Sequence, residues 1–179
     1  MKREKLIHSF KELKNEINID DFELLRDKFT KICQVIPNRE KESLKIDYKD
    51  LDKKTIKRIK RKQKVVYIMV IEGKIFYVGC TNKSLRKRLA HYNDGRERYR
   101  KEGEIHYETT YFILQSLLNI NKPVDIYVHY YRHVENETFM DIFGEEVDIL
   151  NRSPSKTIKK WLLDKIESEF NKKPIGNRN

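Results

Sequence analysis

The sequence is poor in the residues that mark secreted, modular or membrane-spanning proteins. Its 179 residues include only two cysteines, six glycines and four prolines. Because Cys33 and Cys80 cannot build a disulfide framework, we expect a reducing, cytoplasmic location. No apolar run approaches the length of a membrane-spanning helix, and the first ten residues do not resemble a signal peptide. No repeat and no Pro-, Gly- or Ser-rich linker divides the chain, which favours one domain of ordinary size.

Positive charge, by contrast, is in excess. The chain carries 39 Lys and Arg residues against 28 Asp and Glu, a formal charge of +11. Apolar residues make up 38% and aromatic residues 11%, enough for a core and too much for a disordered chain. The charge favours a polyanionic partner, nucleic acid before an anionic membrane surface. The alternative is a well-solvated basic surface on an unrelated protein.

The basic residues gather in three segments. The densest is 53–64, KKTIKRIKRKQK, and the others are 86–88 and 96–101. Residues 53–64 are open to two interpretations, a segment that contacts phosphates or the solvated end of a helix.

Hydrophobic periodicity predicts the secondary structure. Apolar residues at three- and four-residue steps predict two helices over 4–35, with Asp20 and Asp21 between them and Pro37 as the stop. The β-branched runs 65–71 and 74–79, separated by Glu72 and Gly73, predict a hairpin. The remaining predictions are a basic helix capped by Asn82 or Ser84, a helix over 109–120, a strand over 124–133, a short hairpin around Gly144 and a helix over 153–170.

Four residues around the hairpin carry a recognisable pattern. Tyr67 lies on the first strand and Tyr77 on the second, while Arg88 and Tyr92 lie four residues apart on the helix that follows. The pattern, with Val65-Val66-Tyr67 and Tyr77-Val78-Gly79 as its two tripeptides, resembles the GIY-YIG nuclease family. The tail 174–177, Pro-Ile-Gly-Asn, is similar to the family's closing element. The stretches VIEGKIF, YFILQSLLNIN and NKKPI resemble segments of its small type II restriction endonucleases.

The resemblance implies an α+β fold, a small antiparallel sheet flanked by helices. It implies an N-terminal helical extension over 1–52 and a nuclease domain over 53–179, with a DNA-recognition insertion around 93–152. The implied activity is hydrolysis of phosphodiester bonds in double-stranded DNA at a short specific site, within a restriction-modification system.

The resemblance also assigns roles to the four residues. Tyr67 would act as base or water-positioner, which requires a cation such as Arg88 to lower its pKa. Arg88 would offer planar donors to the scissile phosphate, and Tyr77 and Tyr92 would hydrogen-bond the phosphate or the nucleophile. Gly79 and Asn177 would support the site. We expect one divalent ion, Mg²⁺ by preference.

The expected metal ligand departs from the family pattern. The family holds its metal through a glutamate on the late helix, and alignment places that position at Lys159, or at Lys165 by the wider family's spacing. An ammonium group cannot hold Mg²⁺. Three explanations stay open: a register shift that brings in Asp164 or Glu167, a natural loss of cleavage with binding retained, or a selected inactive Glu→Lys form.

Candidate DNA contacts lie outside the four-residue pattern. They are Lys60, Arg61, Lys87, His91, Arg96, Arg98 and Arg100. A palindromic target would favour a homodimer, and the N-terminal helices are the candidates for the dimer contact or for a DNA clamp. The alternatives are a DNA-binding protein on the same scaffold without cleavage, and an RNA-binding module.

Overall fold

The computed structural model describes residues 6–96, 108–130, 138–140, 146–148 and 154–178. The helices are α1 (Glu23–Lys28), α2 (Lys53–Lys60), α3 (Leu85–His91), α4 (Glu108–Ile120) and α5 (Pro154–Phe170). The strands are β1 (Thr30–Asn38), β2 (Ser43–Asp47), β3 (Val65–Ile71), β4 (Lys74–Thr81), β5 (Val124–Tyr130), β6 (Thr138–Met140) and β7 (Glu146–Asp148). Among the described residues, no helix is long and apolar enough to cross a membrane.

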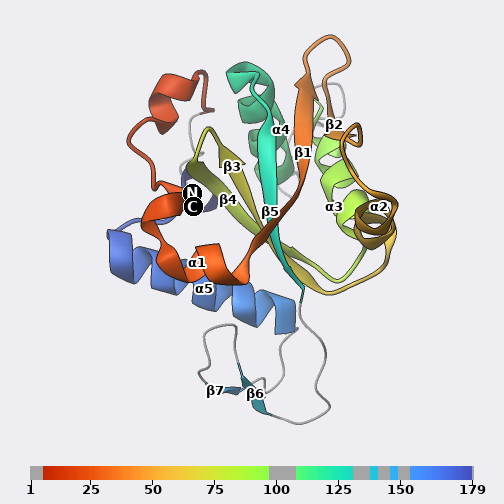
Figure 1. The fold of residues 1–179 in the computed structure, drawn as a ribbon. Coiled ribbons are helices and arrows are strands. Elements are labelled where there is room, and N and C mark those ends of the chain that lie inside the picture. The colour runs from red at the N-terminus through yellow and green to blue at the C-terminus, as the bar shows by residue number, and fades with distance from the viewer. Residues whose placement is uncertain (1–5, 97–107, 131–137, 141–145, 149–153, 179) are drawn as a thin grey trace.

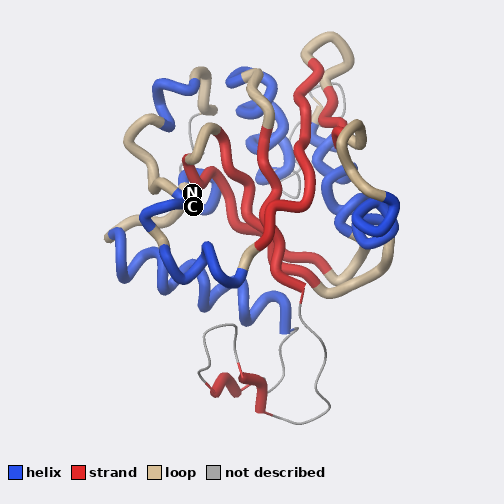
Figure 2. The backbone as a smooth tube through the Cα atoms, viewed as in Figure 1, coloured by secondary structure: helices blue, strands red, loops and turns tan. Residues whose placement is uncertain are grey.

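A five-stranded antiparallel sheet forms the centre of the molecule. Its strand order is β2-β1-β5-β3-β4, so β5 lies between the N-terminal pair and the β3–β4 hairpin (Figures 1 and 2). Strands β6 and β7 pair separately. The α+β architecture implied by the sequence, a small antiparallel sheet flanked by helices, is confirmed.

The β3–β4 hairpin forms for local reasons. Every residue of β3 is buried, as expected of a continuous β-branched and aromatic strand inside a sheet. At the turn, Glu72 and Gly73 both have positive φ angles, 46° and 80°. Two successive positive φ angles match the right-handed twist of a tight hairpin, and Gly73 adopts this conformation without steric cost.

The two faces of the sheet are covered by different helices. One core cluster packs side chains of α3 and α4 against β3 residues such as Val65 and Met69. The other packs α1 and α5 against the alternate β3 residues Val66 and Ile68. Phe22 and Phe170, whose ring centroids are 5.7 Å apart, join the α1 region to the end of α5. Side-chain alternation in β3 therefore decides which residues meet which helices.

The two helices predicted over 4–35 are largely wrong. Between residues 6 and 21 the structure has only the short 3-10 helices Phe10–Leu13 and Ile19–Asp21, and the second predicted helix is wrong over most of its second half. Only α1 is helical there, and β1 begins at Thr30 and includes Pro37. A β-bulge in the pairing with β5 skips Ile32, which places both Ile32 and Cys33 in the core. The bulge breaks strict alternation, so the buried positions imitate helical spacing. Pro37 is tolerated because β1 pairs with β5 only as far as Val35.

The remaining elements follow the predictions closely. The hairpin, the basic helix, the helix at 109–120, the strand from Val124 and the late helix are all present within a few residues of the expected bounds. Strands β6 and β7 pair across the predicted Gly144 turn, although Gly144 itself lies outside the described residues. The five-stranded sheet takes strands from both sides of the expected domain boundary at residue 52.

Candidate active site

Tyr67 lies at the centre of a cluster of buried polar side chains. Its cross-strand partner on β4 is Gly79, and a Cβ atom at Gly79 would overlap the Tyr67 ring. The missing side chain at Gly79 therefore leaves the space that the end of the Tyr67 ring and its hydroxyl occupy. The family resemblance implies a supporting role for Gly79, and close approach of the Tyr67 ring gives that role a physical basis.

A β-bulge in β4 positions Tyr77. The pairing runs from Met69 with Tyr77 to Val70 with Ile75, so Phe76 is the extra residue. The bulge turns Phe76 and Tyr77 toward the same core. The ring centroids of Tyr67 and Tyr77 are 6.4 Å apart. The hairpin and its bulge thus bring Tyr67 and Tyr77 to one face of the sheet.

Asn177 holds the same strand from outside. Its Oδ1 accepts from the backbone N of Val78 at 2.7 Å, and its Nδ2 donates to the Val78 carbonyl at 2.9 Å. Because β4 is an edge strand, this side-chain amide satisfies backbone groups that have no strand partner. A Cβ atom at the neighbouring Gly176 would lie 2.9 Å from the Phe76 carbonyl oxygen. The tail thus packs directly against the bulge that orients Tyr77.

Helix α3 and the 3-10 turn Tyr92–Gly95 that follows it supply the other two side chains. Ser84 caps the helix by accepting from the backbone N of Lys87 at 3.2 Å. One turn further, Arg88 Nε donates to Tyr67 Oη at 3.0 Å, and the Tyr67 and Tyr92 hydroxyls are 2.5 Å apart. The Arg88 guanidinium carbon lies 5.1 Å from the centroid of the Tyr92 ring. The i and i+4 spacing predicted to place Arg88 and Tyr92 on one face of the helix is confirmed.

Burial decides the protonation of this cluster. Tyr67 and Tyr92 are 0% exposed and Tyr77 is 3% exposed. Burial raises the pKa of Tyr67 and of Tyr92 well above the ordinary value, and the nearby Arg88 charge only partly offsets this. Burial opposes the charge of Arg88, but its contacts with Tyr67 and Tyr92 outweigh burial and raise its pKa. The site therefore holds the neutral phenols of Tyr67 and Tyr92 beside a charged guanidinium.

The expected lowering of the Tyr67 pKa is therefore wrong for this structure. The predicted cation is in place, because Arg88 donates to the Tyr67 hydroxyl. Its effect has the predicted sign but is smaller than the effect of burial, so the net pKa rises. A neutral phenol can donate or accept a hydrogen bond, but it is a poor base at neutral pH.

Lys159 reaches the cluster from the opposite face of the sheet. Its helix, α5, packs on β3 and β4 through Ile158, Leu162 and Ile166. Because β4 is the edge strand, a side chain from α5 can reach around it, and Lys159 Nζ lies 5.3 Å from the centroid of the Tyr77 ring. The alternative position, Lys165, instead contacts Trp161 within the same helix, 5.1 Å from that ring's centroid.

Asp164 and Glu167, the carboxylates considered as substitute metal ligands, have no polar contact with the tyrosine–arginine cluster among the described residues. Glu167 forms an ion pair with Lys173 at 3.0 Å, and Asp164 is exposed. Neither has a hydrogen bond or ion pair with the tyrosine–arginine cluster in the part of the chain that the structure describes. Within that part, no three His, Cys, Asp or Glu side chains are grouped as metal ligands. A cationic Lys159 and neutral tyrosines do not fit Mg²⁺, which prefers carboxylate and water oxygens.

The candidate DNA contacts are spread over several elements. Exposed positions are Lys60 and Arg61 at the end of α2, and Lys87 and His91 on α3. Lys60 Nζ lies 5.9 Å from the Tyr48 ring centroid, and His91 Nδ1 lies 2.8 Å from Asp94 Oδ2. Arg96 Nε donates to the Glu42 carbonyl at 3.0 Å. Arg98 and Arg100 lie outside the described residues.

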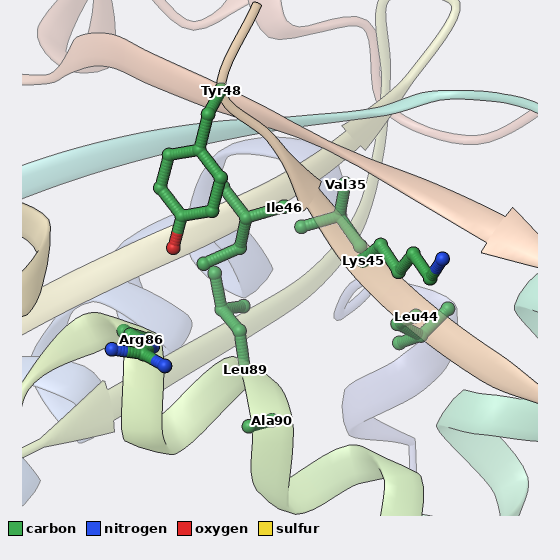
Figure 3. A pocket seen from close by; sticks show the side chains of 8 residues that line it. All are labelled: Val35, Leu44, Lys45, Ile46, Tyr48, Arg86, Leu89 and Ala90. Carbon is green, nitrogen blue, oxygen red and sulfur yellow. The ribbon is translucent and has the colours of Figure 1, made fainter. Parts of the chain in front are cut away.

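A pocket beside α3 is a feature that the sequence patterns do not predict. It has a volume of about 370 Å³ and lies between the β1–β2 pair and α3 (Figure 3). Its apolar lining includes Leu44 and Leu89, and its polar residues include Tyr48 and Arg86. Arg86 and Arg88 both lie on α3 but have different surroundings: Arg86 lines the pocket, whereas Arg88 contacts Tyr67. The packing of β2 on α3 creates this pocket, and no local sequence pattern signals a contact of that kind.

No protein family model matches the chain, and no curated protein matches it either. Two solved structures are similar. The structure described as restriction endonuclease HPY188I in complex with product DNA is 35% identical, with a TM-score of 0.66, and the match covers 100% of this chain and 96% of that one. The structure of a mutant of bacteriophage T4 EndoII is 18% identical with a TM-score of 0.47, covering 91% of this chain and 100% of that one.

The HPY188I match extends over both chains almost from end to end, including the N-terminal strands, the hairpin and the late helix. A sequence identity of 35% over that length shows more than a shared fold. The chain therefore belongs to the restriction endonuclease family of which HPY188I is a member.

Proposed function

We propose that the chain is a type II restriction endonuclease of the GIY-YIG kind, which hydrolyses double-stranded DNA at a short specific site. The observation that carries this proposal is the buried contact among Tyr67, Arg88 and Tyr92, with Tyr77 beside them. These are the residues that the family motif would bring together, and they come from β3, β4, α3 and the turn after α3. The product DNA in the HPY188I structure supports DNA as the substrate class.

The chemistry assigned to the site is attack of a water on phosphorus with departure of the 3′ oxygen. Arg88 donates to Tyr67 through Nε, and its two amino nitrogens donate to no residue among those described. They are planar donors suited to the phosphate oxygens, where negative charge develops. Because burial keeps Tyr67 protonated, we assign it the role of orienting the water or the phosphate rather than that of a free phenolate base.

The arrangement of charge supports a DNA ligand. The +11 charge includes exposed lysines and arginines on α3, which carries Arg88, and on α2, which packs against α3. We assign phosphate contact to Lys60, Arg61 and Lys87. If the target is palindromic, a two-fold dimer would present one site to each strand.

A specific observation favours a second candidate, a sequence-specific DNA-binding protein that does not cleave. Lys159 occupies the position where the resemblance implies a metal-binding glutamate, and its ammonium lies over the Tyr77 ring. An ammonium group repels a cation and has no lone pair to offer it. No step of the mechanism above is therefore assigned to a metal ion.

Matched arginine variants on α3 test the proposal. Arg88→Ala removes the guanidinium from the cluster, and Arg86→Ala removes the same charge from a position two residues away that lines the pocket. We expect Arg88→Ala to lower the rate of duplex cleavage by about a hundredfold or more, and Arg86→Ala to change it by less than about threefold. Equal losses would show that general basic charge, rather than this site, acts on DNA.

A further inference from the structure

Two cations contact the same group of aromatic rings from different helices. Arg88 of α3 lies 5.1 Å from the Tyr92 ring centroid, and Lys159 of α5 lies 5.3 Å from the Tyr77 ring centroid. The Tyr77 and Tyr92 rings pack edge to face, with centroids 6.3 Å apart. Each cation therefore contacts one ring of a single packed pair of rings.

Neither cation has an acidic partner in the described part of the chain. The ion pairs given by the structure there involve other residues, and Asp164 and Glu167 on the same helix as Lys159 do not contact it. Burial keeps the Tyr92 phenol, which lies beside Arg88, neutral by raising its pKa. Two like charges near a low-dielectric cluster repel each other unless an anion lies close to both.

The two side chains complement each other chemically. Hydrogen bonding to Tyr67 fixes the guanidinium plane of Arg88, which leaves its amino groups as oriented donors. Lys159 adds a compact charge with three donors on a flexible stem. A tetrahedral phosphate monoanion can accept from a planar fork and from a point charge at the same time, whereas a divalent cation would be repelled by both.

We propose that Arg88 and Lys159 together bind one phosphate group of the DNA backbone, so that DNA binding at this site requires no divalent cation. This inference rests on the proposed function, because it takes DNA as the ligand. It goes further by assigning to Lys159 a positive role in binding, where the family resemblance would place a metal ion.

The test measures binding of a fluorescent DNA duplex of mixed sequence, in EDTA and in Ca²⁺, over a range of salt concentrations. Lys159→Gln removes the proposed contact, and Lys160→Gln removes an exposed charge at the next position of α5. Lys159→Glu introduces a carboxylate at the position of interest.

For the natural chain we expect equal affinity in EDTA and in Ca²⁺, within about twofold. Lys159→Gln should weaken binding about tenfold and lower the slope of log affinity against log salt by about 1. Lys160→Gln should change affinity by less than about threefold. Lys159→Glu should bind poorly in EDTA and recover in Ca²⁺.

Two results would overturn the inference while leaving the proposed function intact. One is binding by the natural chain that requires Ca²⁺, and the other is an equal effect of the Lys159→Gln and Lys160→Gln substitutions. Absence of any DNA binding by a folded natural chain would instead overturn the proposed function, and this inference with it.

Discussion

At the scale of single residues, the hydroxyl of Tyr67 has two partners in a space that excludes water. Tyr92 Oη lies 2.5 Å away and Arg88 Nε 3.0 Å away. A buried hydroxyl must be hydrogen-bonded to avoid a desolvation cost, and here the satisfied contacts also define the site. The same burial keeps the phenols of Tyr67 and Tyr92 neutral, so it determines both how these side chains pack and whether they can act as bases.

The raised pKa values predict a loss of stability in alkali. The unfolded chain ionises its tyrosines near the ordinary pKa of 10.0, while folded Tyr67 and Tyr92 stay protonated. Their contribution to the free energy of unfolding is therefore complete below pH 10 and is lost as the pH rises from 10 toward the folded pKa values. Urea unfolding between pH 8 and pH 11 measures this loss.

Tyr67→Phe separates this effect from the titration of lysines. The variant should be less stable at pH 8 by about 1 kcal/mol, because one hydrogen-bonded hydroxyl is gone. Its further loss of stability above pH 10 should be smaller than that of the natural chain. Parallel loss in both proteins would show that Tyr67 does not titrate as its burial requires.

Gly79→Ala should disrupt the site without altering any functional group. The added Cβ atom would overlap the Tyr67 ring, so the ring must move or the strands must separate. We expect destabilisation of about 1–3 kcal/mol and loss of activity on DNA. Cys80→Ala, a truncation at the next position of the same strand, is the control and should have a small effect on both. A Gly79→Ala protein with unchanged stability would contradict the close contact.

At the scale of elements, the edge strand β4 depends on a distant segment. Asn177 pairs with both backbone groups of Val78, across 99 residues of sequence. Asn177→Ala should lower the free energy of unfolding by about 1–3 kcal/mol, because two backbone groups lose their partners. It should also speed hydrogen exchange at the Val78 amide. Unchanged exchange at Val78 would show that the tail does not protect the strand.

Local elements of this fold are predictable from sequence, whereas long-range ones are not. The hairpin and α3 follow from β-branched runs, a two-residue turn and the Ser84 cap, all readable within a few residues. The motif spacing therefore locates Tyr67 and Arg88 correctly. In contrast, the pattern over β1 predicts a helix, because the bulge at Ile32 imitates helical spacing and the pairing with β5 is distant in sequence.

In the candidate site, too, some features are predictable from sequence and others depend on long-range packing. The resemblance to the family motif implies that Tyr67, Arg88 and Tyr92 lie close together, and the structure brings them into contact. The raised pKa of Tyr67 does not, because it depends on burial contributed by several elements. The proximity of Lys159 to Tyr77 depends on where α5 crosses the edge of the sheet, which no local pattern encodes.

At the scale of the whole molecule, charge and fold point to the same partner. A net charge of +11 alone distinguishes poorly between a DNA-binding protein and a merely basic one. The tyrosine–arginine cluster includes Arg88 of the basic helix α3, against which the basic helix α2 packs, and the HPY188I relative was solved with product DNA. The central claim is that this cluster is an active site for cleavage of duplex DNA.

Digestion of a plasmid of known sequence tests that claim most directly. The purified chain, its Arg88→Ala variant and its Lys159→Glu variant are incubated with the plasmid, with and without Mg²⁺, and the fragment ends are sequenced. We predict discrete fragments from the natural chain, with ends at one short recurring sequence, and none from Arg88→Ala. Fragments from Lys159→Glu alone would favour the DNA-binding candidate. The absence of site-specific fragments from both the natural chain and Lys159→Glu, with both proteins folded, would contradict the central claim.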